Sequence, residues 1–280
     1  MPGIDLHAHS SASDGTTSPA ALVQHAVEVG LEVVALTDHD TTAGWDEAAE
    51  ALPAGLRLVR GAEISCVHGG ISLHLLAYLF DPGHPPLVQA LQRLRDSRLG
   101  RAERMVQKLV ADGVPVTWGQ VQGLAGGTVG RPHVAQALVD AGLVSSVDEA
   151  FSDDWIGTGG RYWASKEDLD VLEAIRLVRD AGGVAVFAHP AATSRGRTVG
   201  EPVIEEMAAA GLAGLEVDHP DHGEDARRRM REVAADLGLF VTGSSDFHGA
   251  NKDVALGAWR TDPAAYDELV GRAVGAEVVQ

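Results

Sequence analysis

Four short motifs that contain Asp and His stand out in the sequence as candidate metal ligands. They are Asp5-Leu6-His7-Ala8-His9, Thr37-Asp38-His39, Ala188-His189-Pro190 and Ser245-Asp246-Phe247-His248. Each motif follows a short apolar run that is typical of a buried strand. Imidazole and carboxylate groups are preferred ligands of Zn, Mn and Fe, so these motifs predict a site with more than one metal ion. The chemistry expected of such a site is hydrolysis.

Three further residues extend this ligand set: Asp14, Glu63 and His74. Glu63 lies in an apolar segment and can bridge two metal ions, or it can pair with Arg57 or Arg60 as an ordinary strand carboxylate. His74 can be a ligand or a core histidine. So many ionisable groups at one rim of a sheet would be costly without metal, because burial and mutual repulsion disfavour their charges. This favours a ligand role for all of them, namely His7, His9, Asp14, His39, Glu63, His74, His189, Asp246 and His248.

Composition limits the possible partners and location of the protein. The chain has 280 residues, of which 45% are hydrophobic, enough for a large core. The formal net charge of −18 argues against a long nucleic-acid partner, whereas small anionic substrates are compatible with a metal cluster. Cys66 is the only cysteine, which excludes an intramolecular disulfide and fits a reducing compartment. No signal peptide or membrane-spanning run is present, so we expect a cytoplasmic protein without membrane contact.

Apolar strand-like runs alternate with amphipathic helical stretches, which indicates an α/β architecture. Strands are expected at 31–37, 56–59, 62–66, 72–78, 184–188, 214–217 and 239–242, and helices near 199–210 and 224–237. After the first motif, Ser18 and Pro19 predict a helix start. The candidate ligands follow the carboxyl ends of at least four strands, where active sites lie in βα-barrels.

One region interrupts the alternation and predicts a helical insertion. A long helix is expected at 86–112, followed as far as 163 by short helical pieces and Gly-rich turns. Ser165 is the expected N-cap of the next helix, with Asp168 in the capping-box position. Residues 98–163 are therefore expected to form a wall or lid over a site carried by residues 1–97 and 164–280.

Two residues of this insertion, Arg131 and His133, are candidate phosphate ligands. They stand in the segment Gly130-Arg131-Pro132-His133 at an expected helix start. Arginine binds phosphate through two parallel hydrogen bonds, and a helix N-terminus attracts anions. The alternative is that both are ordinary residues near the start of a helix.

Other polar residues receive weaker assignments. Asp38 is expected to orient a ligand rather than bind metal itself. His219 is a candidate general acid or phosphate contact, and His222 is expected on a loop surface. The tryptophans of the insertion are expected to be core residues rather than a stacking surface for a nucleobase: Trp118, Trp155 and Trp163.

Taken in order from Leu6 to Gly249, the motifs resemble the PHP (polymerase and histidinol phosphatase) superfamily. This resemblance implies a distorted (β/α)7 barrel, similar to a TIM barrel, with a trinuclear metal centre at the strand C-termini. It implies that His7 and His9 bind a first ion with Glu63 and Asp246, that Glu63 bridges to a second held by His74 and His189, and that Asp14, His39 and His248 bind a third. Some members have histidine where this chain has Asp14, a change that can shift metal preference toward Mn or Fe.

Within this superfamily the chain most resembles stand-alone phosphoesterases. The segments that carry this resemblance are Ser13-Asp14-Gly15, the insertion with Gly130-Arg131-Pro132-His133, and the loop from Glu216 to His222. The resemblance implies hydrolysis of a phosphate monoester in 3′,5′-nucleoside bisphosphates, such as adenosine 3′,5′-bisphosphate, or in 5′-phosphorylated oligonucleotide ends. Two or three ions (Mn, Zn or Fe) would share the attacking hydroxide. The alternatives are a histidinol-phosphate phosphatase and a metal-stabilised binding module without catalysis.

Overall fold

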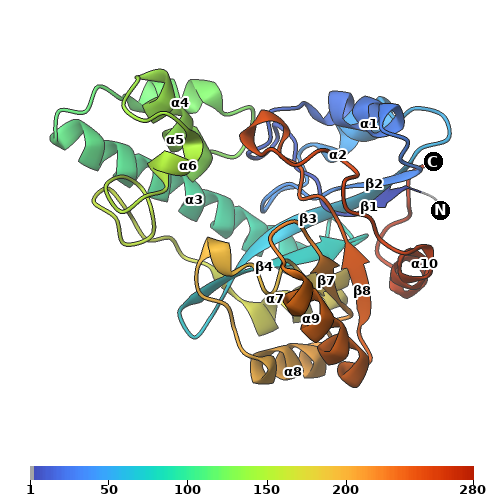
Figure 1. Cartoon of the computed structure of the whole chain (residues 1–280). Helices are drawn as coiled ribbons and strands as arrows, with labels where there is room; N and C mark the ends of the chain where they lie inside the picture. The colour runs from blue at the N-terminus through green and yellow to red at the C-terminus, as the bar shows by residue number, and fades with distance from the viewer. Residues whose placement is uncertain (1–2) are drawn as a thin grey trace.

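The computed structural model describes residues 3–280, apart from the side chain of Arg195. Seven strands follow one another around a nearly closed mixed sheet (Figure 1). Their order is β1 (Ile4–Asp5), β2 (Val33–Leu36), β3 (Arg57–His68), β4 (Ile71–Tyr78), β6 (Val184–Phe187), β7 (Gly214–Asp218) and β8 (Phe240–Gly243). A bridge between Ala8 and Phe247 joins the segments that follow β1 and β8. Strand β4 is antiparallel to β3 and β6, and the other neighbours are parallel. The expected distorted α/β barrel is confirmed.

Strand β3 differs from the sequence prediction because it is one long strand rather than two. It pairs with β2 through residues 57–60 and with β4 through residues 61–68. Gly61, which lies between the two predicted strands, permits close packing, since a Cβ there would lie 2.8 Å from the Ala77 carbonyl oxygen. Gly69 and Gly70, both with positive φ, form the two-residue turn to β4. A short strand, β5 (Leu169–Asp170), adds to β3 outside the barrel order.

Helices cover the outside of this sheet. They are α1 (Pro19–Glu28), α2 (Trp45–Glu50), α7 (Val171–Asp180), α8 (Glu201–Ala210), α9 (Glu224–Leu237) and α10 (Pro263–Arg272), with 3-10 turns η1 (Thr193–Arg195) and η2 (Gly249–Asn251). The predicted start of α1 is confirmed: the Ser18 side chain accepts from the backbone N–H of Ala21, and Pro19 occupies the first turn. No helix among the described residues has both the length and the apolar character needed to cross a bilayer.

The predicted helix start at Ser165 is wrong. Helix α7 begins after Asp170, whose carboxylate accepts from the first free N–H groups of the helix. The preceding segment runs extended along α3 (Pro85–Ala111), because the Ser165 carbonyl accepts from Arg104 and the Glu167 N–H donates to Ser97. These tertiary hydrogen bonds override the local capping signal.

The insertion is helical and has an apolar core of its own. Helices α4 (Trp118–Leu124), α5 (Arg131–Asp140) and α6 (Val147–Ala150) gather with the end of α3 on one side of the barrel (Figure 1). Buried apolar residues between 102 and 164 pack together there, and Trp118, Trp155 and Trp163 pack against them as expected. Because α3 contributes to this core and to that of the barrel, the division at 97/98 and 163/164 remains a prediction.

Candidate metal centre

All nine predicted metal ligands lie at one end of the barrel. Loops after β1, β2, β6 and β8 carry seven of them, and the β3–β4 hairpin carries Glu63 and His74. Backbone contacts bind these loops to one another: the His9 N–H donates to the Phe247 carbonyl, and His39 forms a bridge with Glu63. Eight of the nine side chains are buried, while the His74 side chain is 25% exposed.

Glu63 lies at the centre of this cluster. Its Oε1 is 2.8 Å from His74 Nδ1 and 3.0 Å from His189 Nε2. Its Oε2 is 3.3 Å from His7 Nε2, 3.1 Å from His9 Nε2 and 3.1 Å from His39 Nδ1. Both oxygens of one carboxylate therefore face several imidazole nitrogens. This is the arrangement required of a carboxylate that bridges two cations.

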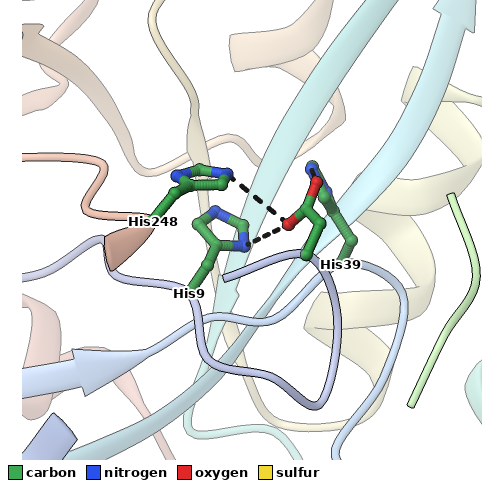
Figure 2. Close-up of side chains that lie close together, drawn as sticks. His9, His39 and His248 are labelled. Atoms are coloured by element: carbon green, nitrogen blue, oxygen red, sulfur yellow. Dashed lines mark ion pairs between the residues drawn. The ribbon is translucent and has the colours of Figure 1, made fainter. Parts of the chain in front are cut away.

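Asp14 is the centre of a second group, opposite His9, His39 and His248. Its carboxylate oxygens are 3.6 Å from His9 Nδ1, 3.6 Å from His39 Nε2 and 3.5 Å from His248 Nε2. Figure 2 shows the three labelled rings converging around one carboxylate. The pKa of Asp14 lies well below its ordinary value, because His39, His248 and His9 outweigh the desolvation that burial imposes.

The potential ligand atoms fall into three groups in which all atoms lie within 4.8 Å of one another. The groups are His9, Asp14, His39 and His248; His7, His9 and Asp246; and His39, Glu63 and His74. His9 and His39 each belong to two groups, whereas the resemblance assigned each to one ion. His189 joins the cluster through Glu63.

The chemistry of these donors fits divalent metal ions. The buried Nδ1 atoms of His39 and His74 lie near Glu63 oxygens but form no hydrogen bond with them. His7 donates from Nδ1 to Glu216 at 2.9 Å, and its Nε2 faces Glu63 and Asp246. Imidazole nitrogens and carboxylate oxygens that converge in this way are a donor set that can hold divalent cations.

Glu216 is a functional residue that sequence reasoning missed. Besides His7, it accepts from the Ser244 hydroxyl, and its Oε2 accepts from the backbone N–H of His189 at 2.8 Å. Burial alone would raise the pKa of Glu216, but His7 lowers it well below its ordinary value. Glu216 therefore orients two predicted ligands. The available signal was a charged residue in the middle of the apolar run that forms strand β7.

The backbone is strained next to several site residues. Asp40, His189 and Asp246 have φ angles of 57°, 32° and 52°, values that residues other than glycine rarely adopt. Asp5 fixes the loop of Asp246, since its carboxylate accepts from the Ser245 hydroxyl at 2.6 Å and from the Ser245 N–H at 3.1 Å. Unusual φ values that surrounding hydrogen bonds enforce are typical of functional sites.

A cavity of about 510 Å³ opens beside the cluster. His39, His74, His189 and His248 line it together with residues from the insertion and from the loops after β6 and β8. The polar lining residues from the insertion and from these two loops are Arg131, Asp148, Thr158, Ser194, Arg197, Thr198, Asn251 and Lys252. Residues of the insertion thus line part of this cavity, and their role as a wall or lid of an active site stays a prediction.

The candidate phosphate ligands Arg131 and His133 lie in different surroundings. Arg131 lines the cavity, and its guanidinium stacks on the Phe151 ring with 5.1 Å between Cζ and the ring centroid. His133 is buried and is not among the lining residues; its Nδ1 accepts from the Gly130 N–H at 3.0 Å at the start of α5. His133 therefore stabilises the helix start that presents Arg131.

Asp38 and His219 contact residues that carry or form the metal-ligand cluster. Asp38 accepts from the Ser10 N–H at 2.8 Å and from the Ser13 hydroxyl at 2.6 Å, which fixes the loop that carries His9. His219 is fully buried, and its Nε2 lies 3.4 Å from Asp246 Oδ2. Both positions suit residues that orient ligands.

The expectation that His222 lies on a loop surface is wrong. Its side chain is only 2% exposed. Its Nδ1 donates to the Val217 carbonyl at 2.8 Å, and its Nε2 accepts from the Ala191 N–H at 3.1 Å. His222 thus connects the loops that follow β6 and β7.

Comparison with known proteins agrees with this geometry. The family model of the PHP domain matches residues 5–98. A 5′-3′ exoribonuclease of Haemophilus influenzae is 36% identical over 245 residues, which cover 87% of this chain and 89% of the relative. A 3′,5′-nucleoside bisphosphate phosphatase of Chromobacterium violaceum is 34% identical over 251 residues, which cover 89% of this chain and 88% of the relative.

Solved structures support the same assignment. A Bifidobacterium adolescentis protein described as a metal-dependent phosphoesterase superposes with a TM-score of 0.92 at 39% identity, covering 98% of this chain and 97% of its own. A Chromobacterium violaceum amidohydrolase with bound sulfate and no metal gives 0.86 at 32% identity, covering 97% of each chain. The chain belongs to the PHP domain family. It is an enzyme, a metal-dependent phosphoesterase of this family.

Proposed function

We propose that this enzyme hydrolyses a phosphate monoester of small nucleotides, either 3′,5′-nucleoside bisphosphates or 5′-phosphorylated oligonucleotide ends. The observation that carries the proposal is the Glu63-centred cluster of imidazoles and carboxylates, open to a cavity that Arg131 also lines. The exoribonuclease and bisphosphate phosphatase activities for which the Haemophilus and Chromobacterium relatives are named support this substrate class.

Two or three divalent ions, Mn, Zn or Fe, are proposed to bind the nine clustered residues. When bound, they would supply an activated water and neutralise the charge of the phosphoryl oxygens. The protein's part is to hold the ligands in place: Glu216 fixes the His7 ring, and Asp38 fixes the loop of His9. We propose that Arg131 binds a substrate phosphate, because its guanidinium faces the cavity and forms no ion pair among the described residues.

The dimensions and charge of the protein support a small substrate. A cavity of about 510 Å³ is within the range of sites that bind single small molecules. The net charge of −18 disfavours a long nucleic-acid track. We further propose a cytoplasmic location, which the single, buried Cys66 supports because it offers no disulfide partner.

A substrate panel tests the proposal. The Mn-loaded protein is assayed for phosphate release from adenosine 3′,5′-bisphosphate, a 5′-phosphorylated trinucleotide and histidinol phosphate. We expect the nucleotides to be preferred, and we expect His9→Ala and Asp246→Ala to abolish turnover. A clear preference for histidinol phosphate would overturn the substrate assignment. No turnover of any phosphoester, together with a lower melting temperature after chelation, would instead indicate a metal-stabilised binding module.

A further inference from the structure

Lys252 brings a cation into contact with the predicted metal ligand Asp246. It lies six residues after Asp246, directly behind the turn η2, and it lines the cavity. Its Nζ donates to Asp246 Oδ2 at 2.6 Å. The side chain of Lys252 is 31% exposed, whereas that of Asp246 is 1% exposed. A lysine at the rim of the cavity therefore reaches a carboxylate that is buried in the ligand cluster.

The two carboxylate oxygens of Asp246 face different groups. Oδ1 lies 3.4 Å from one ring nitrogen of each of three predicted ligands: His7, His9 and His248. Oδ2 faces Lys252 and, at 3.4 Å, the Nε2 atom of His219. A distance of 3.4 Å is long for a hydrogen bond between nitrogen and oxygen, so Lys252 is the stronger of these two partners. Lys252 thus holds the oxygen that does not face the imidazoles.

The turn that carries Lys252 is fixed on the loop of another predicted ligand, Asp14. The Ala250 N–H donates to the Thr16 hydroxyl at 2.8 Å. Asn251 Nδ2 donates to the Asp14 carbonyl oxygen at 2.8 Å. Because both hydrogen bonds hold the backbone just before Lys252, its side chain starts from a defined position and only the side chain has to be ordered.

Lys252 has two opposing effects on a cation that Asp246 would bind. Hydrogen-bond partners that orient a metal ligand typically contribute about 10- to 100-fold to metal affinity. The positive charge of Lys252 also repels a bound cation. Water reduces this repulsion, because the lysine side chain is partly exposed at the cavity rim. The orienting effect should therefore be the larger one.

We propose that Lys252 is a positioning residue for Asp246. By holding Oδ2, it keeps Oδ1 directed toward His7 and His9, the two imidazoles that form one group of potential ligands with Asp246. This inference deepens the proposed function and rests on the metal-binding role that the proposed function gives to Asp246. Lys252 acts through this carboxylate and needs no contact with the substrate.

A calorimetric titration of Mn into metal-free protein tests the inference without any turnover. Lys252→Met removes the donor to Oδ2, and we expect it to lower Mn affinity by about tenfold or more. Lys252→Arg keeps a charged donor and should retain most of the wild-type affinity. Arg176→Met, which removes one positive charge from an exposed position on α7, is the matched control and should titrate like the wild type. The melting temperature of each metal-free protein checks that it is folded.

The possible results separate this inference from the proposed function. Unchanged Mn affinity in folded Lys252→Met would overturn the positioning role. Tighter Mn binding would also overturn it, since repulsion by the lysine charge would then outweigh orientation. An equal loss of affinity in Lys252→Arg and Lys252→Met would show that the donor to Oδ2 is not the cause, with the same consequence. If Mn affinity depends on Lys252 as expected but no phosphoester is hydrolysed, the proposed function fails and the positioning role stands.

Discussion

Glu216→Gln tests whether Glu216 fixes the orientation and protonation of the predicted metal ligand His7. In the wild type both carboxylate oxygens receive hydrogen bonds: one from His7 Nδ1 at 2.9 Å and from Ser244, the other from the His189 N–H at 2.8 Å. A glutamine has the same shape, but its NH₂ group must face one of these donors. If it faces His7, the ring must carry its proton on Nε2, the nitrogen that points toward Glu63 and Asp246.

The size of the effect follows from these contacts. Loss of one hydrogen bond to a charged group costs about 1.5–3 kcal/mol. Mutations of residues that orient a metal-binding histidine typically lower metal affinity by about 10- to 100-fold, which is a similar free energy. We therefore expect Mn affinity to fall by about 10- to 100-fold.

The assay is a calorimetric titration of Mn into metal-free wild type and Glu216→Gln, with the melting temperature of each metal-free protein as a check on folding. Glu205→Gln, an exposed position on α8, is the matched control and should titrate like the wild type. Unchanged Mn affinity in a folded Glu216→Gln protein would refute the argument that Glu216 sets the protonation of His7.

Two further substitutions test the support of the site. Arg98→Met leaves Asp40 buried without its partner, so we expect a loss of about 3–5 kcal/mol in the free energy of unfolding, measured by urea denaturation; a loss below about 1 kcal/mol would contradict the importance of this pair. Arg98 outweighs the effect of burial and lowers the pKa of Asp40. The ion pair therefore stabilises the fold above the pKa of aspartate in the unfolded chain, and this stabilisation is lost as the pH falls through the lower pKa of the folded state. In Arg98→Met, the free energy of unfolding should consequently depend less on pH on the acid side. Gly127→Ala would place a Cβ 2.3 Å from the Ala12 carbonyl oxygen, where the insertion contacts the loop between His9 and Asp14. We therefore expect a lower melting temperature in thermal denaturation. An unchanged melting temperature would show that the backbone at this contact can move apart without cost.

The site motifs could be predicted from the sequence because each is local. A strand that ends in Asp and His presents both at the same rim, whichever strands lie beside it. Glu216 and His222 could not be predicted in this way. Their roles depend on β7 lying next to β6, which brings the His189 and Ala191 N–H groups within reach. Pairing between strands that are distant in the sequence cannot be recognised from the hydrophobic pattern of either strand.

The errors in the fold have the same origin. The predicted gap between strands 56–59 and 62–66 is absent, because Gly61 continues β3 where the backbone of β4 approaches closely. Ser165 suggested a helix start, but its backbone is engaged by α3.

Metal stoichiometry tests the central claim most directly. Wild type and Glu63→Gln, both saturated with Mn and then freed of loose ions by gel filtration, are compared by elemental analysis. The Glu63-centred arrangement predicts two or three ions per wild-type chain and at least one fewer in the variant. A folded wild type that retains no ion under these conditions would contradict the assignment of these side chains as a polynuclear metal centre.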